Sequence, residues 1–178
     1  MSTSEEFLES VFLSNTLRDA FATRARSGGR RIYRDKKPTD KARTAVGNAL
    51  KSKLRSLAWQ YYSRKVEDVT HIRNIAALAR FVSTTSGVFL NGGRLFFGVA
   101  QKALNLYLKY LWCWDPNFIP PHCPFDDKII KALGALPVGV DTKWTTSNSV
   151  PSYRAWVAAA RAIAGNQSLA DWELEVWS

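Results

Sequence analysis

The sequence predicts an all-α fold, a compact multi-helix bundle with a helix-hairpin-helix-like element. Apolar residues recur at helical spacing in several segments, and no segment alternates polar and apolar residues with the period of a strand. One stretch near the middle is apolar on nearly every side, as expected of a helix buried within a bundle. With 178 residues, 46% of them hydrophobic, the chain is long enough to form a full core, and we interpret residues 1–178 as a single domain.

Caps and breaks predict the helix boundaries. Ser4 can cap a first helix, with Glu5 and Glu6 in the opening turn, where the helix dipole favours anions. Its apolar stripe is expected to comprise Phe7, Leu8, Val11, Phe12 and Leu17. The other expected helices are Lys41–Ser63 after a Thr39-Asp40 cap, His71–Ser83, Val99–Trp114, a short helix from Asp126 or Asp127 through Leu133, Tyr153–Ala164 opened by Ser152, and a terminal helix from Ser168.

The net charge of +10 is concentrated in one basic segment, residues 18–65, which holds fifteen Lys or Arg residues and only three acids. Such a segment favours a polyanionic partner, most often nucleic acid, over an ordinary solvated surface. The residues expected to contact the phosphate backbone of the nucleic acid lie on an irregular basic arm and on the outer face of the helix that follows it. They are Arg30, Arg31, Lys36, Lys37, Lys51, Lys53 and Arg55.

Other features of the sequence exclude several classes of protein. No apolar run reaches the eighteen or so residues of a membrane span, and the acidic, polar N-terminus is unlike a secretory signal. Two cysteines do not suggest a disulfide scaffold, so we expect a cytoplasmic, intracellular protein. No P-loop, dinucleotide-binding glycine motif or nucleophile elbow is present, and we expect no cofactor.

The segment of residues 88–133 carries the pattern with the most chemical meaning. A glycine turn at Gly92-Gly93-Arg94 precedes the stretch from Gly98 to Asn105, which places Lys102 in the opening turns of a helix. Asp126 follows 24 residues later, after a proline-rich loop. An amine and a carboxylate that converge in one cleft can act as nucleophile and as electrostatic or proton-transfer partner.

This segment resembles the helix-hairpin-helix DNA glycosylases of the endonuclease III type over about Ile72–Leu133. Gly98-Val99 matches the glycine-valine of their hairpin, Lys102 its lysine and Asn105 its asparagine, while Phe125–Ile129 matches the segment that bears their aspartate. The resemblance implies that Lys102 attacks the sugar C1′ of an extruded nucleotide and that Asp126 supports expulsion of the base. It also implies that backbone amides near Gly98 bind a phosphate of double-stranded DNA.

Ala100 stands where that family has a second hairpin glycine. We therefore expect Gly92, Gly93 and Arg94 to contact the phosphate backbone of the nucleic acid instead. A flipped base would stack on aromatic side chains. Those available at or near this helix are Phe96, Phe97, Tyr107, Trp112 and Trp114, although such residues at helical spacing are more often core.

Two alternatives to a DNA glycosylase with possible lyase activity remain open. One is a non-enzymatic helical protein that binds nucleic acid, such as a regulator. The other is an interaction module, such as an antitoxin or a defence-system subunit, whose basic face meets an acidic protein. We expect no metal, because the spacing of Cys113, His122, Cys123 and His71 is no known zinc pattern, and both cysteines are expected in the core. The late tryptophans Trp144, Trp156, Trp172 and Trp177 are expected to close the core against the first helix.

Overall fold

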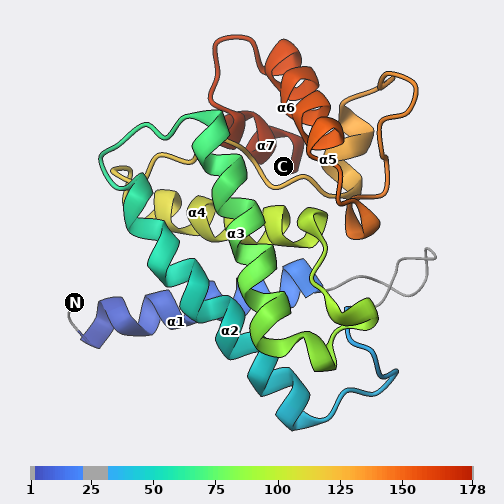
Figure 1. The fold of residues 1–178 in the computed structure, drawn as a ribbon. Helices are drawn as coiled ribbons and strands as arrows, with labels where there is room; N and C mark the ends of the chain where they lie inside the picture. Colours follow the sequence, from blue (N-terminus) through green and yellow to red (C-terminus); the bar gives the residue numbers. More distant parts are fainter. Residues whose placement is uncertain (1–2, 22–31, 178) are drawn as a thin grey trace.

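Helices make up most of the described chain, and α4 lies at their centre (Figure 1). The computed structural model describes residues 3–21 and 32–177. The α-helices are α1 (Thr3–Phe21), α2 (Asp40–Ala58), α3 (Asp68–Ser86), α4 (Phe97–Trp114), α5 (Asp127–Ala132), α6 (Val150–Ala164) and α7 (Leu169–Trp177). Short 3-10 turns are η2 (Trp59–Tyr61), η3 (Gly87–Phe89), η4 (Asn91–Gly93) and η5 (Trp144–Thr146). Within these residues only two isolated bridges have β character, which confirms the all-α prediction.

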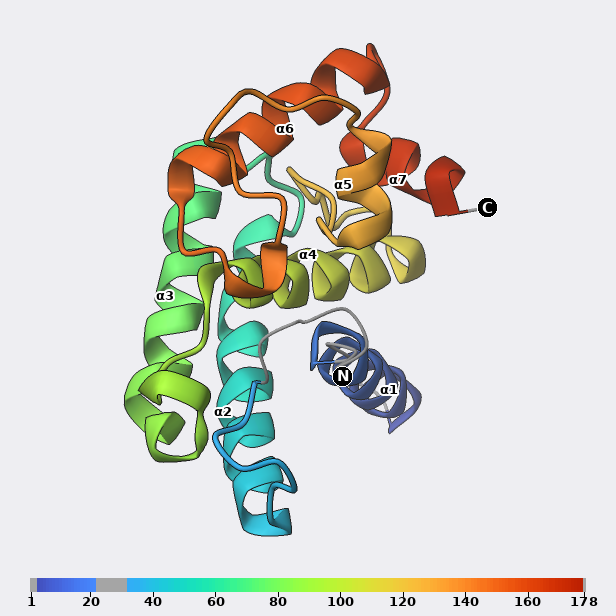
Figure 2. The ribbon, with the colours of Figure 1, turned by 90° about the vertical axis from the view of Figure 1, so that its right-hand side faces the viewer.

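The helices form layers around α4. Figure 2 shows α4 crossing the molecule between α1 and α2 on one side and α5, α6 and α7 on the other. The helices α2 and α3 pack side by side, and both α1 and α3 lie against α4. The residues between α3 and α4 include the glycine turn at η4, where Gly92 and Gly93 have positive φ. Whether this element corresponds to a helix-hairpin-helix stays a prediction.

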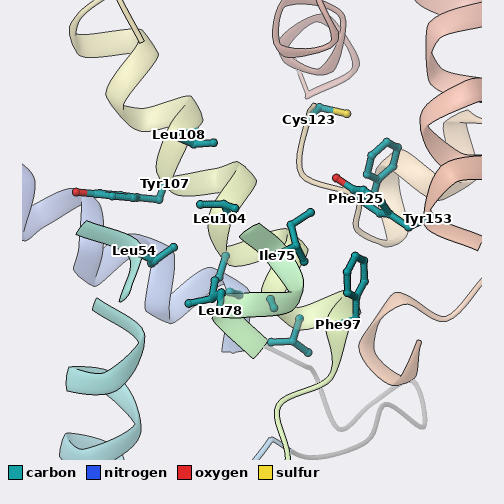
Figure 3. Packing of buried hydrophobic residues seen from close by; sticks show 14 of the residues in the cluster. Leu54, Ile75, Leu78, Phe97, Leu104, Tyr107, Leu108, Cys123, Phe125 and Tyr153 are labelled. Carbon is teal, nitrogen blue, oxygen red and sulfur yellow. The ribbon is translucent and has the colours of Figure 1, made fainter. Parts of the chain in front are cut away.

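The core is built on α4, which is buried along most of its length, as its all-round apolar sequence predicts. On the side facing α2 and α3, Leu104 and Leu108 pack among Leu54, Ile75 and Leu78 (Figure 3). On the other side, residues from the proline-rich loop and α6 complete the cluster. The rings of Phe125 and Tyr153 meet edge to face with their centroids 5.6 Å apart.

Two predictions about α1 are wrong. The helix already includes Ser4, so Ser4 is not its cap. Its buried side is formed by Leu13, Thr16 and Ala20, whereas the first part of the expected stripe faces outward: Phe7 is 68% exposed. The helix packs on α4, but the side that α4 covers is the one that bears Leu13, Thr16 and Ala20, and Phe7 lies away from it.

Two expectations for the C-terminal helices also need correction. The cap of α6 is Ser149, whose hydroxyl accepts a hydrogen bond from the Ser152 amide, and Ser152 lies inside the helix. The tryptophans do not close the core against α1, because α7 packs on α5 and α6. Trp177 is half exposed with Lys128 over its ring, while Trp144 is buried, as are Trp156 and Trp172.

None of the helices in residues 3–21 and 32–177 is long and apolar enough to cross a membrane.

Candidate functional site

Lys102 and Asp126, the two predicted catalytic residues, lie together in the structure. Lys102 sits in the second turn of α4, and Asp126 immediately precedes α5. The Lys102 Nζ lies 3.2 Å from Asp126 Oδ2, and each side chain is 12% exposed. The two residues therefore form an ion pair at the edge of the core, with a small part of each side chain open to solvent.

The cap of α5 fixes the orientation of the Asp126 carboxylate. Its Oδ1 accepts hydrogen bonds from the backbone amides of Lys128 (3.0 Å) and Ile129 (3.1 Å). These are amides that a helix start leaves without intrahelical partners. Because Oδ1 is occupied in this way, Oδ2 is the oxygen presented to Lys102. One carboxylate thus both starts α5 and binds the amine.

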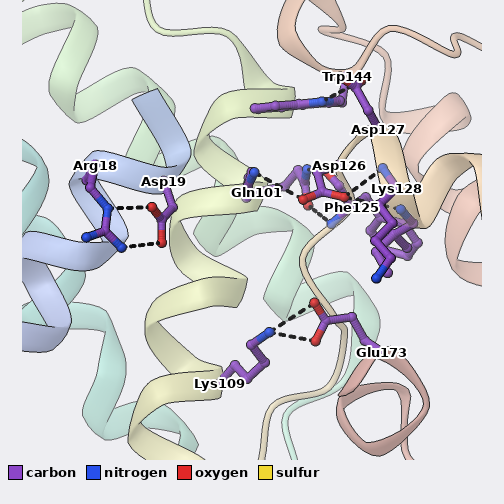
Figure 4. Close-up of polar contacts among 12 residues, drawn as sticks. Arg18, Asp19, Gln101, Lys109, Phe125, Asp126, Asp127, Lys128, Trp144 and Glu173 are labelled. Carbon is purple, nitrogen blue, oxygen red and sulfur yellow. Dashed lines mark hydrogen bonds and ion pairs between the residues drawn. The ribbon is translucent and has the colours of Figure 1, made fainter. Parts of the chain in front are cut away.

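Gln101 holds the backbone next to Asp126 against α4 (Figure 4). Its amide donates to the Phe125 carbonyl at 2.6 Å and accepts from the Phe125 N–H at 3.1 Å. Asn105, one turn further along α4, donates to the Cys123 carbonyl at 2.9 Å. Both side chains are fully buried, so they satisfy backbone groups that would otherwise be unpaired in the core. The segment before α5 is therefore fixed to α4 by hydrogen bonds as well as by packing.

The Trp144 side chain packs over the Lys102–Asp126 pair. Lys102 Nζ lies 4.8 Å from the centroid of a Trp144 ring, and the indole N–H donates to Asp127 Oδ1 at 3.0 Å. The backbone of Trp144 lies so close to Gly98 that a Cβ built there would be 1.7 Å from the Trp144 carbonyl oxygen. Only glycine fits at this position of α4, and the reason is the approach of the 144–148 segment.

The first amides of α4 are already bonded within the protein. Phe97 N–H donates to Asn148 Oδ1 at 3.0 Å, and Gly98 N–H donates to the Ser147 carbonyl at 2.9 Å. Gly98 is also buried. The expectation that Gly98 contacts a phosphate is therefore incompatible with this geometry. Gly92, Gly93 and Arg94 are exposed, and their role as a backbone contact stays a prediction.

The aromatic residues expected to hold a flipped base do not gather at Lys102. Phe96, Phe97 and Tyr107 are core residues, each at most 6% exposed. Trp114 is exposed, but it lies twelve residues along α4 from Lys102, about 18 Å at the helical rise. Trp144, which was expected only to fill the core, is the aromatic residue at the pair.

A chain of buried polar side chains lies behind the site, and its first part runs from α3 to α4. Asn74 donates to the Tyr61 hydroxyl at 2.8 Å, and that hydroxyl lies 2.8 Å from His71 Nδ1. His71 Nε2 lies 2.8 Å from Asn105 Oδ1. Because an amide oxygen can only accept, His71 carries its proton on Nε2 and accepts from Tyr61 on Nδ1. Asn105, which anchors the Cys123 carbonyl, is thereby oriented by His71.

The second part of the chain runs from α4 to the surface. Asn105 donates to the Tyr153 hydroxyl at 3.1 Å, which lies 2.8 Å from His122 Nδ1. His122 Nε2 lies 3.0 Å from Asp68 Oδ1, and Arg161 binds the same carboxylate with two bonds of 2.6 and 2.7 Å. Since Asp68 accepts, Tyr153 donates to His122 and His122 donates to Asp68. From Asn74 to Asp68, every bond of this buried polar chain is donated in the same direction.

Burial decides the protonation of both histidines. Burial lowers the pKa of His122 to about 4, despite its bond to Asp68, and it holds the pKa of His71 well below its ordinary value. The Arg161 guanidinium holds the pKa of the Asp68 carboxyl well below its usual range. Near neutral pH both histidines are therefore neutral, and the charged groups, Asp68 and Arg161, lie at the exposed end of the chain. These hydrogen bonds were not predicted from the sequence, because His71 and His122 lie 51 residues apart and meet only through the fold.

A second lysine on α4 makes a comparable ion pair. Lys109 Nζ lies 2.7 Å from Glu173 Oε2, with the two side chains 13% and 1% exposed (Figure 4). Burial raises the pKa of the Glu173 carboxyl, and the bond to Lys109 opposes that effect. The two lysines lie two turns apart on one side of α4. They differ in that Lys102 is paired with the cap of α5 and has Trp144 over it.

The predicted contacts to the nucleic-acid backbone divide into three groups. Lys36 and Lys37 are exposed before α2, and Arg30 and Arg31 lie outside the described residues. The three cations of α2 are engaged within the protein: Lys51 donates to Ser14 at 3.3 Å, Arg55 pairs with Glu9 at 3.1 Å, and Lys53 lies over the Phe81 ring. These contacts hold α2 against its neighbours, while the Arg55 side chain remains 51% exposed.

The cysteines and histidines do not form a metal centre in the part of the chain that the structure describes. Cys123 is buried, as expected, but Cys113 is exposed, so the expectation that both are core residues is wrong for Cys113. His71 and His122 are both used in the buried polar chain.

In comparisons with known proteins, no family model, no curated protein and no solved structure matches this chain.

Proposed function

We propose that this protein binds DNA and breaks the glycosidic bond of one nucleotide at Lys102 and Asp126, as a DNA glycosylase with lyase activity. The observation that supports the proposal is the 3.2 Å contact between Lys102 Nζ and Asp126 Oδ2. The Asp126 carboxylate is held in position by the cap of α5 and by the bonds of Gln101 to Phe125. Chemistry of this kind needs such a preorganised pair.

The chemistry begins with loss of a proton from Lys102, because an ammonium group cannot attack. We assign the acceptance of that proton to Asp126 Oδ2, which lies 3.2 Å from the amine. The free amine then forms a bond to C1′, and the base departs with the electron pair of the broken glycosidic bond and takes up a proton. Cleavage of the C1′–O4′ bond, with a proton taken up by O4′, then opens the sugar and gives a covalent imine. Loss of a C2′ proton from this imine breaks the C3′–O bond and releases the 3′ phosphate, which is the lyase step. This scheme comes from the family that the segment resembles.

The experiment is borohydride trapping on duplex DNA with an abasic site, which forms the imine without requiring knowledge of the base. We expect the wild-type protein to become covalently linked to the DNA and to cut it. The Lys102→Gln variant should lose at least tenfold in trapping, while binding to the same duplex stays within about twofold.

Lys109→Gln is the matched control, because it also removes a lysine of α4 from a largely buried ion pair. It should trap like the wild type. Trapping that survives in Lys102→Gln, or that falls equally in both variants, would contradict the assignment of the nucleophile.

A second candidate function is non-enzymatic binding of nucleic acid. The observation that favours it is that Ser147 and Asn148 occupy the first amides of α4, where the resembled family binds a phosphate. It predicts a wild-type protein that binds DNA or RNA and neither traps nor cuts an abasic duplex. The same trapping experiment therefore decides between the two functions.

A further inference from the structure

A pocket with aromatic walls lies at the opposite end of α4 from Lys102. It has a volume of about 220 Å³ and opens between the first turns of α1, the end of α2 and the end of α4. Small-molecule sites commonly measure about 300–1,000 Å³. A pocket of this size fits one small group, comparable to an amino-acid side chain.

Its walls expose aromatic rings to solvent. Trp59 is 62% exposed, Trp114 41% and Tyr62 39%. Two of these rings pack on buried Phe118, whose centroid lies 5.8 Å from that of Trp59 and 5.1 Å from that of Tyr62. Fixed, exposed aromatic rings in a concave site are typical of a binding surface.

The charge of the pocket is opposite to that of the whole protein. Glu5, Glu9 and Asp115 line it, and the described lining includes no Lys, Arg or His, although the chain carries a net charge of +10. Glu9 is positioned by a 2.7 Å bond from the Tyr107 hydroxyl and by its ion pair with Arg55. The ion pair with Arg55 offsets part of the charge of Glu9.

Helix ends add to this negative potential. α4 ends at Trp114 and α2 ends at Ala58, and both residues line the pocket. A helix C-terminus carries a partial negative charge that favours a cation within the last turn. Carboxylates, aromatic faces and two helix C-termini therefore point to the same kind of ligand.

We propose that this pocket binds an organic cation, an alkylammonium or guanidinium group placed against the rings of Trp59 and Trp114. The faces of these rings attract a cation through their quadrupoles, and Glu5 and Asp115 add charge attraction. The cation belongs either to a free small molecule or to a basic side chain of a partner protein. This site is independent of the Lys102–Asp126 pair and does not depend on the proposed reaction.

The test compares a cation with a neutral molecule of the same shape. Tryptophan fluorescence and calorimetry would follow titration with choline and with its uncharged isostere 3,3-dimethylbutan-1-ol. We expect choline to bind more than tenfold more tightly. Equal binding of the two, or no binding of choline and of agmatine, a guanidinium compound, at millimolar concentration, would overturn the proposal.

Substitutions of the pocket residues test whether the cation binds in this pocket. Trp114→Leu should lose roughly 2- to 30-fold in affinity, the range that one cation–π contact supplies. Glu5→Gln with Asp115→Asn should weaken the cation and leave the neutral isostere unchanged. Trp177→Leu is the control, because Trp177 is similarly exposed (49%) but lies on α7. Affinity that is the same in all variants would overturn the assignment.

A final titration distinguishes the two sources of the cation. A blocked five-residue peptide with one central arginine is compared with free agmatine. Tighter binding of the peptide indicates a partner protein, whereas tighter binding of agmatine indicates a small molecule. Either result supports a cation site.

Discussion

At the scale of single residues, two helical glycines meet very different surroundings. A Cβ on Gly98 would lie 1.7 Å from the Trp144 carbonyl oxygen, whereas a Cβ on Gly47 would meet only the end of the Leu17 side chain at 3.2 Å. The first obstacle is backbone that is bonded in place, because Ser147 accepts from the Gly98 amide. The second obstacle, Leu17, is a partly buried side chain that can change rotamer.

Gly98→Ala should therefore lower the free energy of unfolding by about 1–3 kcal/mol or more, the usual effect of overpacking. Gly47→Ala should be neutral or stabilising, because alanine is favoured over glycine by about 1 kcal/mol in a helix interior. Urea denaturation followed by circular dichroism measures both. Equal stability of the two variants would contradict the close packing of the 144–148 segment on α4.

The sequence identified Lys102 and Asp126 but not the residues that position them. The short motifs around the lysine and the aspartate could be compared with a known family pattern, and the structure shows that the two side chains meet. Trp144 reaches the pair from the short 3-10 turn η5, which is too short for apolar periodicity to predict which way a side chain points. Gln101 stands next to Lys102 in the sequence, but its bonds to Phe125 depend on how the proline-rich loop folds back.

At the scale of elements, the loop of residues 115–126 has no helix of its own and is held by buried hydrogen bonds. His122 ties it to α3 through Asp68 and to α6 through Tyr153. Protonation of His122 would turn Nδ1 into a donor facing the Tyr153 hydroxyl, which already donates to it. That hydroxyl would have to reverse, and Asn105 also donates to it. The one-way direction of the buried polar chain therefore opposes the charged form.

This loop should make the protein less stable in acid. The unfolded chain binds a proton at His122 with its ordinary pKa of 6.5, but the folded chain does so only near 4. Between these values the unfolded state holds more protons, so stability falls as the pH drops from about 6.5 to 4, by up to about 3 kcal/mol for His122. His71 contributes with the same sign.

His122→Gln keeps a donor and an acceptor but does not titrate. Denaturation curves at pH 7 and pH 4.5 should show a smaller loss of stability in the variant than in the wild type. Equal losses would mean that His122 does not carry the acid sensitivity.

Helix positions followed from the sequence better than helix faces did. Apolar spacing placed α2, α3 and α4, and α4 extends two residues before the predicted start at Val99 because Phe97 and Gly98 bond to the 144–148 segment. The same reasoning failed for α1, where Phe7 is exposed and Thr16 is buried. Spacing shows that a helix has an apolar side, but the neighbouring helices decide how much of that side is covered.

At the scale of the whole molecule, the net charge of +10 predicts that binding to nucleic acid depends on salt. Lys36→Gln with Lys37→Gln should reduce the slope of log K against log salt for duplex DNA by about 1.8, because each phosphate contact contributes roughly 0.9. Substitution of Lys131 and Arg154, which are exposed on α5 and α6, by glutamine removes the same charge and should reduce this slope less. Equal changes would indicate a diffuse attraction with no preferred face.

The position of α4 also bears on how the protein is made. The buried side of α1, with Leu13 and Ala20, packs mainly on a helix that ends about ninety residues later in the chain. At ribosomal rates of about 5–20 residues per second, α1 waits roughly 5 to 20 seconds before its partner has been synthesised. The helices α2 and α3 are neighbours in sequence and can pair during that interval. We therefore expect nascent chains that are halted before residue 97 to leave α1 open to proteases and to chaperones.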